Sequence, residues 1–258
     1  MSINSLNIKS MFFCVGLFIY LTFIVNTRCH GYVMPAEQLL EFMAKNFSKF
    51  KTVVIIQSTL RTDRENERVF KEEIRMKSPD LFHLKALDHI AEKRETPDMT
   101  YLQLLMANSG ERLEHLLSVM GIDLQSVAFT RIEGVIAYRI GEKEPGSPKI
   151  LIEKERFLPL LIEYRLPEDK GGEMITAQFQ DYREQDDKYY PFEISYSEGD
   201  SINEQYTVQS FQYNVPLDES SLQIFTINPS LYIPPEEVSD IEEERLLNIL
   251  RAFEEKYQ

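Results

Sequence analysis

Apolar and polar residues alternate along three successive runs in the second half of the chain. The alternating apolar positions are Leu160, Ile162, Tyr164 and Leu166, then Ile175, Ala177 and Phe179, and then Phe192, Ile194 and Tyr196. A period of two, with β-branched and aromatic residues, is typical of strands that bury one face. Because only short turns separate the runs, neighbouring strands are expected to be antiparallel. The pattern predicts an antiparallel meander over residues 148–213.

Shorter apolar runs outside the meander predict further strands. They lie at residues 51–60, 67–76, 81–87, 127–131 and 134–140, with a short closing segment at 222–225. The first of these runs contains Val53, Val54, Ile55 and Ile56, so it is apolar on both faces. In the second run, Phe70 and Ile74 fall on one side, which we expect to be buried.

Apolar residues at helical spacing predict helices on both sides of the meander. Residues 36–47 form one such stripe, and residues 100–120 form a second that Gly110 divides and Gly121 ends. Residues 236–258 form a third, acidic at its beginning. We expect the second stripe to act as a lid over the sheet, through Leu102, Leu105, Met106, Leu113, Leu116 and Leu117.

Together these elements predict an α+β fold, in which helices cover the concave face of a curved antiparallel β-sheet. The sheet would be a half-barrel of roughly nine to eleven strands. The expected domain organisation is a signal peptide over residues 1–31, the half-barrel over 32–234 and an acidic amphipathic helix over 235–258.

The N-terminal stretch has the composition of an export signal. Lys9 precedes an almost entirely apolar run over residues 11–25, which is the length of a signal-peptide core. We place cleavage near Gly31, and an uncleaved signal anchor is the alternative. Both cysteines, Cys14 and Cys29, lie in this stretch, so a cleaved chain would contain no disulfide.

Charge and motifs narrow the function classes. A formal net charge of −14 argues against nucleic acid or an anionic membrane surface as a partner. The 4 histidines include no HExxH or HxH arrangement, and we find no GxSxG, P-loop or GxGxxG motif. We therefore expect no metal, no cofactor and no catalytic residues. A hydrolase that uses loop carboxylates is a remote alternative.

The apolar face of the predicted sheet has two interpretations. Either the helices fill it completely and form an ordinary core, or a curved sheet under a helical lid leaves a cleft for one apolar ligand. In the second case, the cleft residues would be Val54, Ile56, Phe70, Ile74, Phe82, Leu84, Leu160, Ile162, Tyr164, Ile175, Phe179, Phe192 and Ile194. His83 alternates with Phe82 and Leu84, which places it on the opposite face.

Three segments resemble a known family. Residues 150–159 are similar to a strand-to-proline step of the LolA/LolB lipoprotein-carrier superfamily, and residues 178–194 are similar to the family's next strand pair. Residues 211–214, which end at Asn214, resemble its closing step. With the order of the elements, the resemblance covers nearly all of the chain after residue 31. It departs at Ser78, where the family's periplasmic carrier has an arginine that latches the lid.

The resemblance implies a periplasmic protein with a LolA-like lipid-binding domain. It would bind lipid or lipoprotein acyl chains in its cleft and shuttle them between membranes. An inner-membrane exporter and an outer-membrane acceptor would be its partners, and we expect a monomer. Since the arginine latch is absent, a lipid carrier not committed to lipoproteins is favoured.

A protein of another class remains open at this point. With a filled core, the chain would be a periplasmic interaction or sensor protein. It would then dock a partner through the apolar stripe of the C-terminal helix, at Leu246, Ile249, Leu250 and Phe253.

Overall fold

A computed structural model of the 258-residue chain describes residues 33–63, 66–78, 80–89, 98–166, 172–186, 188–199 and 202–224. The described residues from Met34 onward belong to one compact unit, and the description below concerns those residues. The predicted signal peptide, the C-terminal helix and most of the loop before residue 98 lie outside the described residues.

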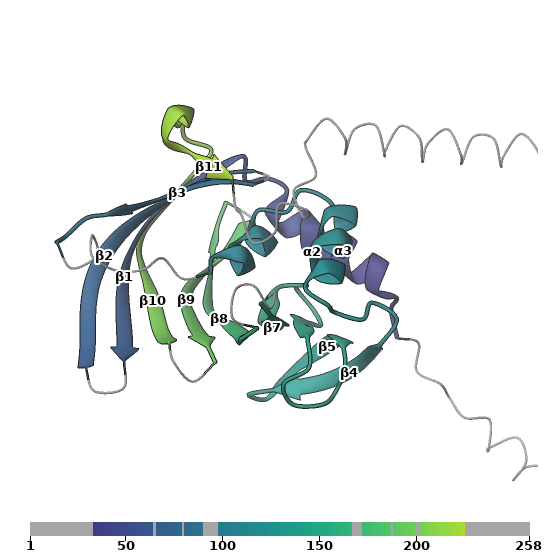
Figure 1. Cartoon of the computed structure of the whole chain (residues 1–258). Coiled ribbons are helices and arrows are strands. Elements are labelled where there is room, and N and C mark those ends of the chain that lie inside the picture. The colour runs from purple at the N-terminus through teal and green to yellow at the C-terminus, as the bar shows by residue number, and fades with distance from the viewer. Residues whose placement is uncertain are drawn as a thin grey trace, which may run out of the picture. The chain divides into compact units, whose positions relative to one another are not determined.

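Eleven strands form one antiparallel sheet that does not close into a barrel (Figure 1). Its order is β11-β3-β2-β1-β10-β9-β8-β7-β6-β5-β4. The strands are β1 (Thr52–Asp63), β2 (Asn66–Lys77), β3 (Leu81–Ala86), β4 (Val127–Ile132), β5 (Val135–Gly141), β6 (Lys149–Glu153), β7 (Pro159–Arg165), β8 (Met174–Gln185), β9 (Lys188–Glu198), β10 (Ile202–Tyr213) and β11 (Gln223–Ile224). The predicted meander and the shorter strands are confirmed, as are the α+β class and the open sheet.

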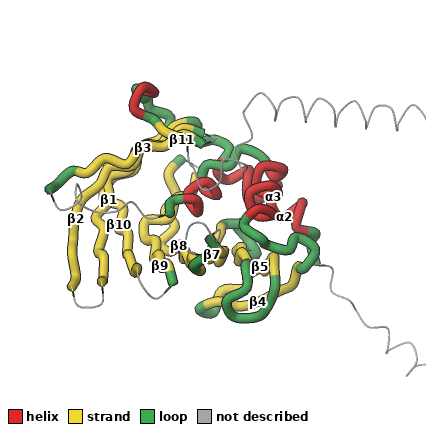
Figure 2. Tube along the Cα trace, in the orientation of Figure 1, coloured by secondary structure: helices red, strands yellow, loops and turns green. Residues whose placement is uncertain are grey.

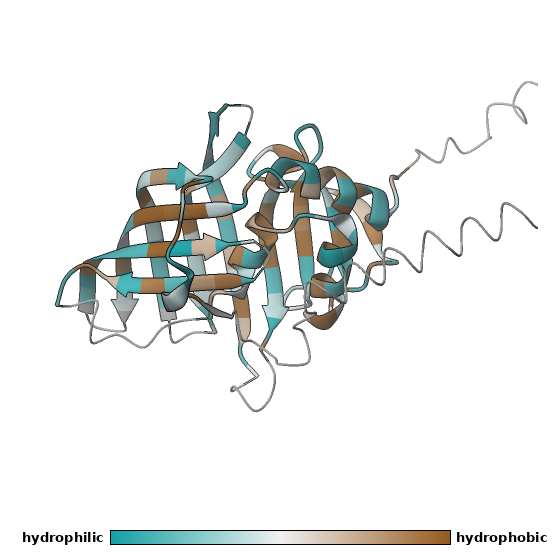
Figure 3. Ribbon diagram, turned by 90° about the horizontal axis from the view of Figure 1, so that it is seen from above, coloured by the Kyte–Doolittle hydropathy of each residue, from teal (hydrophilic) through white to brown (hydrophobic). Residues whose placement is uncertain are grey.

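Cross-strand register gathers the apolar positions on one face, which we call the buried face. Ile55 pairs with Ile74, Ile74 pairs with Leu84, and Ile162 pairs with Ala177. Residues directly opposite each other in neighbouring strands point to the same side of a sheet. Figure 3 shows hydrophobic and hydrophilic residues alternating along the strands. The opposite face is called the outer face below.

Two separate strand groups meet where β1 pairs with β10. Strands β1 to β3 follow one another in the chain, and so do β4 to β10, whereas β1 and β10 come from opposite ends of the described residues. Asn214 reinforces this junction just after β10. Its side-chain oxygen accepts from the Lys51 amide at 2.8 Å, and its side-chain nitrogen donates to the Lys49 carbonyl at 3.1 Å.

The first predicted helix is confirmed as α2 (Ala36–Phe47), which contacts α3 and β9. The second stripe forms two helices: a 3-10 helix, η2 (Thr100–Leu105), and an α-helix, α3 (Gly110–Val119). A short 3-10 helix, η4 (Glu219–Ser221), precedes β11. In Figure 2, α2 and α3 lie side by side.

Gly110 is the first residue of α3, after the break between η2 and α3, and its backbone lies very close to Glu41 of α2. The Ser109 hydroxyl accepts from the Arg112 amide at 3.3 Å and caps α3. A Cβ atom at Gly110 would stand 2.9 Å from a Glu41 carboxylate oxygen and 3.0 Å from the Glu41 backbone. Only glycine fits this contact without displacing α2. Within the described residues, no helix has the length and hydrophobicity that a membrane crossing requires.

Candidate functional site

The buried face of the sheet carries an aromatic cluster completed by a residue from η2. Tyr101 is 1 % exposed, and its ring centroid lies 6.1 Å from that of Phe179, 5.6 Å from that of Tyr196 and 6.4 Å from that of Tyr206. These three partners belong to β8, β9 and β10. The 3-10 helix therefore inserts one side chain onto the middle of the sheet face that was predicted to bind a ligand.

Polar side chains occupy the same face beyond this cluster, and they are also buried. The Thr59 hydroxyl donates to Glu72 Oε2 at 2.8 Å. Arg61 Nη1 donates to Glu204 Oε1 at 3.3 Å, and the Tyr206 hydroxyl donates to Glu204 Oε2 at 2.5 Å. Gln57, Thr59, Glu72 and Glu204 are all buried. Along β1 the buried face thus changes from apolar to polar, and each buried carboxylate has a hydrogen-bonding partner.

Residues 98–120 contain η2 and α3, and we call them the covering segment. At its start, Asp98 accepts hydrogen bonds from the Tyr164 hydroxyl and, at 2.9 Å, from the Thr100 hydroxyl. Burial, and then the charge of Asp98, raise the pKa of Tyr164 well above its ordinary value. Tyr164 therefore stays protonated and acts as the donor, which links the covering segment to β7.

Two further polar contacts link the covering segment to the turn between β2 and β3. The Ser78 hydroxyl donates to the Met106 carbonyl at 3.0 Å, and Arg112 forms an ion pair with Asp80. The side chains of Arg112 and Asp80 are 10 % and 5 % exposed. The turn that contains Ser78 is therefore linked to the covering segment by one hydrogen bond and one buried ion pair.

His115 follows Arg112 by one turn of α3, and folding favours its neutral form. Burial lowers the pKa of His115, and the neighbouring Arg112 guanidinium lowers it further. Among the described residues, none forms a hydrogen bond with its Nε2 atom. The contribution of neutral His115 to stability is complete above the unfolded pKa of about 6.5 and is lost as the pH falls through that value towards the lower folded pKa.

Replacing His115 with leucine should reduce the acid sensitivity of the fold. Between about pH 7.5 and pH 5.5, the wild type should lose more of its free energy of unfolding than His115→Leu does. Urea unfolding of both proteins at the two pH values measures the difference. If both lose the same amount, protonation of His115 does not contribute.

Most of the predicted cleft residues share the buried face. These are Phe70, Ile74, Phe82, Leu84, Ile162, Tyr164, Ile175, Phe179, Phe192 and Ile194. Leu160 lies at a register shift between β6 and β7, and it lines a pocket with Gln178 and Gln180 of the outer face. The six predicted lid residues are all buried: Leu102, Leu105, Met106, Leu113, Leu116 and Leu117.

The register corrects three of the predicted cleft residues: Leu160, described above, and Val54 and Ile56. Val53 and Ile55 occupy the buried face of β1, so the intervening Val54 and the following Ile56 project from the outer face. Because this strand is apolar on both faces, alternation alone did not indicate which side is buried. His83 pairs with Arg75 on the outer face, opposite to Phe82 and Leu84, as predicted.

Sequence reasoning missed the polar part of the buried face. Gln57 and Thr59 continue the alternation of Val53 and Ile55, and Glu72 lies between Phe70 and Ile74. Because these residues stand at alternate positions with buried apolar residues, the sequence period did indicate that they face the core. The prediction missed them because it considered apolar positions only. The described residues contain no group of three or more His, Cys, Asp or Glu that could hold a metal ion.

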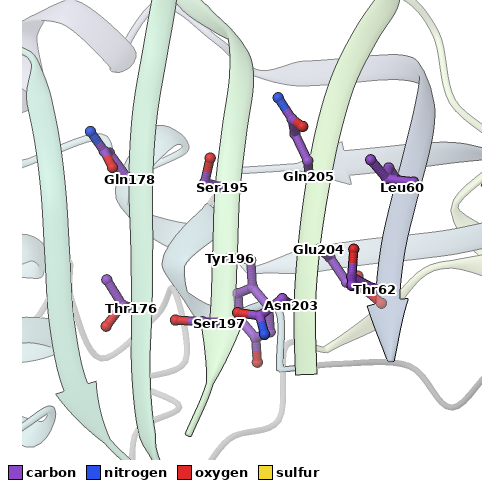
Figure 4. Close-up of a pocket in the computed structure, with 10 residues that line it drawn as sticks. All are labelled: Leu60, Thr62, Thr176, Gln178, Ser195, Tyr196, Ser197, Asn203, Glu204 and Gln205. Carbon is purple, nitrogen blue, oxygen red and sulfur yellow. The ribbon is translucent and has the colours of Figure 1, made fainter. Parts of the chain in front are cut away.

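The described part of the outer face includes two hollows. One pocket of ≈ 290 Å³ crosses β8, β9, β10 and β1 (Figure 4), and a second of ≈ 290 Å³ lies between β8 and the turn that joins β4 to β5. Gln178 lines both pockets, and its side chain donates to the Glu133 carboxylate of that turn at 3.0 Å.

Comparisons with known proteins place the fold. No protein-family model and no curated protein matches the sequence. A LolA superfamily protein from Nitrosomonas europaea aligns with 73% of this chain and 98% of its own, with a TM-score of 0.50 and 9% identity. The fold is therefore LolA-like, as the resemblance in the sequence implied.

Two other solved structures align over similar lengths. A putative outer membrane lipoprotein-sorting protein domain from Vibrio parahaemolyticus covers 72% of this chain and 96% of its own, with a TM-score of 0.45 and 11% identity. A DUF1329 family protein from Desulfovibrio piger covers 73% of this chain and 97% of its own, with a TM-score of 0.46 and 8% identity.

Proposed function

We propose that this protein is a periplasmic carrier that binds the acyl chain of a lipid or lipoprotein on the buried face of the sheet. The chain would enter when the covering segment moves off the concave side of the sheet. The LolA-like fold supports this function, because it provides an open sheet whose buried face is apolar over much of its area. The export signal expected from residues 1–31 is consistent with a periplasmic location.

The position of Tyr101 is the observation that carries the proposal. Its ring lies against Phe179 and Tyr196, on the surface where the acyl chain would bind. It belongs to a 6-residue 3-10 helix, whose hydrogen bonds have poorer geometry than those of an α-helix. Moving η2 therefore costs less than disrupting a strand, and it would uncover aromatic surface in the middle of the sheet.

The energetics suit reversible binding. Burial of a methylene contributes about 0.8 kcal/mol, so an acyl chain of roughly 16 carbons gains on the order of 10 kcal/mol. The same movement removes Tyr101 and its buried neighbours Leu102 and Leu105 from their apolar contacts, which opposes the gain. The net affinity is then small enough for release to an acceptor. The protein would transfer a lipid or lipoprotein from a donor in one membrane to an acceptor in the other, with no covalent step.

Analysis of bound lipid tests the proposal directly. Organic extracts of the protein, purified from its native envelope, should contain lipid in near-stoichiometric amount by mass spectrometry. The purified protein should also take up a fluorescent fatty acid, and an excess of unlabelled acyl chain should displace it. A protein that neither carries lipid nor takes up the probe would refute the carrier function.

A matched pair of variants on α3 tests the role of the covering segment. Leu116 is 6 % exposed and Val119 is 39 % exposed on the same helix. A charge at Leu116 opposes packing of α3, so Leu116→Glu should change fatty-acid uptake several-fold, whereas Val119→Glu should leave it unchanged. Circular dichroism confirms that each variant is folded. Equal uptake by both variants and the wild type would show that α3 does not gate the site.

A further inference from the structure

We infer that the outer face of the sheet binds a short, uncharged glycan in the pocket across β8, β9, β10 and β1 (Figure 4). This site lies on the side of the sheet opposite to the proposed acyl site. It is therefore a second binding function that does not depend on lipid transport. Three features of the pocket support it: the order of its polar side chains, their lack of charge and their unused hydrogen-bonding groups.

The pocket is lined by two regular rows of side chains that run across the strands. In one row, Gln178 pairs with Ser195, Ser195 with Gln205, and Gln205 with Leu60. In the other row, Thr176 pairs with Ser197, Ser197 with Asn203, and Asn203 with Thr62. Strands in a sheet are about 4.8 Å apart, so four strands give each row a length of roughly 14 Å. This length suits a short oligosaccharide lying across the strands.

The two rows contain no charged residue, although the chain as a whole has a formal net charge of −14. Charge returns at the margins of the rows, where Glu163 pairs with Thr176 and Glu67 pairs with Thr62. At the end of the first row, the Glu133 carboxylate accepts from Gln178 at 3.0 Å. Glu204 also lines the pocket, but its carboxylate is engaged by Arg61 and Tyr206 of the buried face. The flanking carboxylates would repel an anionic ligand, and a cationic ligand would meet counter-charge only at the margins. The rows themselves, which are uncharged, therefore favour a neutral ligand.

Six of the eight side chains in the rows keep their hydrogen-bonding capacity for a ligand, whereas Gln178 donates to Glu133 and Leu60 is apolar. Among the described residues, no side-chain hydrogen bond is made by Thr62, Thr176, Ser195, Ser197, Asn203 or Gln205. Hydroxyl and amide groups both donate and accept, which matches the hydroxyl and N-acetyl groups of a sugar. Protein interfaces are instead anchored by Trp, Tyr and Arg. Of these, only Tyr196 lines this pocket, and its ring packs against Tyr101 and Tyr206 on the buried face. A glycan therefore fits the pocket better than a protein partner does.

The test is a binding measurement with two uncharged probes, a β-1,4-linked N-acetylglucosamine tetramer and maltotetraose. Isothermal titration of the full chain should detect at least one probe with a Kd in the millimolar range or tighter. Gln205→Lys changes an exposed position of the first row, and Ser195→Arg fills its centre; each should weaken binding about tenfold or more. Thr207→Lys places the same charge on the outer face of β10, next to the rows, and should leave binding unchanged.

The outcomes separate this site from the acyl site. Fatty-acid uptake should be the same in Gln205→Lys, Ser195→Arg and the wild type, because these residues lie on the outer face. Binding of neither probe by the wild type would overturn the inference. So would an equal loss in Thr207→Lys, or glycan binding that Gln205→Lys and Ser195→Arg leave intact. Binding of another protein at this face, with no response to either glycan, would also contradict it.

Discussion

Replacing Tyr101 with alanine should both destabilise the protein and increase its uptake of a fluorescent fatty acid. Truncation of a buried aromatic side chain costs about 3–5 kcal/mol, because the contacts are lost and a cavity remains. Here the cavity would open against Phe179, Tyr196 and Tyr206, where the acyl chain is proposed to bind. An acyl ligand can fill this space and recover part of the lost free energy. Urea unfolding with and without fatty acid measures both effects.

Tyr189→Ala is the matched control. Tyr189 lies in β9, and its hydroxyl donates to Glu184 in an exposed hydrogen bond of 2.9 Å. Its loss should cost about 1 kcal/mol or less and should leave fatty-acid uptake unchanged. If Tyr101→Ala loses stability but fatty acid restores none of it, the space under Tyr101 belongs to an ordinary core. The filled-core interpretation would then replace the carrier function.

Arg112→Met should destabilise the protein about as much as Tyr101→Ala does. It should also loosen the attachment of the covering segment to the turn between β2 and β3. In Arg112→Met, the buried carboxylate of Asp80 would lose its ion pair, and among the described residues no donor reaches its Oδ2 atom. Breaking a buried ion pair from one side costs about 3–5 kcal/mol. We expect faster hydrogen exchange at residues 100–106, because their amides would become exposed to solvent when the covering segment moves. Chemical denaturation and exchange mass spectrometry provide the two measurements.

A second variant shows whether the unpaired charge is the cause. Asp80→Asn combined with Arg112→Met removes both charges, and it should recover most of the stability lost in the single variant. Lys45→Met serves as a control, because its pair with Glu41 is 3.9 Å long and more than half exposed on both sides. It should cost about 0.5 kcal/mol or less. A double variant no more stable than Arg112→Met would mean that the methionine itself disturbs the packing of α3.

The sheet was predictable wherever a strand buries one face only. Ile162 and Tyr164 in β7, and Ile175, Ala177 and Phe179 in β8, alternate with less buried, mostly polar residues, so the sequence period agrees with the burial. In β1 both faces are apolar over Val53 to Ile56, and only pairing with β2 determines which side is buried. Leu160 was misplaced for a related reason, because a register shift at β7 changes the side to which it points.

The candidate site was less predictable, because its contacts join distant parts of the chain. The apolar stripe of residues 100–120 identified the covering segment, but its period does not distinguish a 3-10 turn from an α-helix. Contacts such as those of Tyr101 with Tyr206, or of Arg112 with Asp80, depend on how the strands pair. The polar rows of the outer face follow from the register of four strands, and no single segment contains them.

The junction between β1 and β10 has a consequence for how the protein folds. Strands β1 to β3 and β4 to β10 can each form by local zipping, but the ladder that unites them joins residues such as Val53 and Tyr213, with most of the chain in between. Loop-closure entropy makes such a contact slow, so the final docking of the two strand groups should limit the folding rate. Asn214, which bonds Lys49 and Lys51 across this junction, completes the ladder only at that late step. Until then the edges of β1 and β10 stay unpaired, and a chaperone that shields unpaired strands would protect the newly synthesised chain from aggregation.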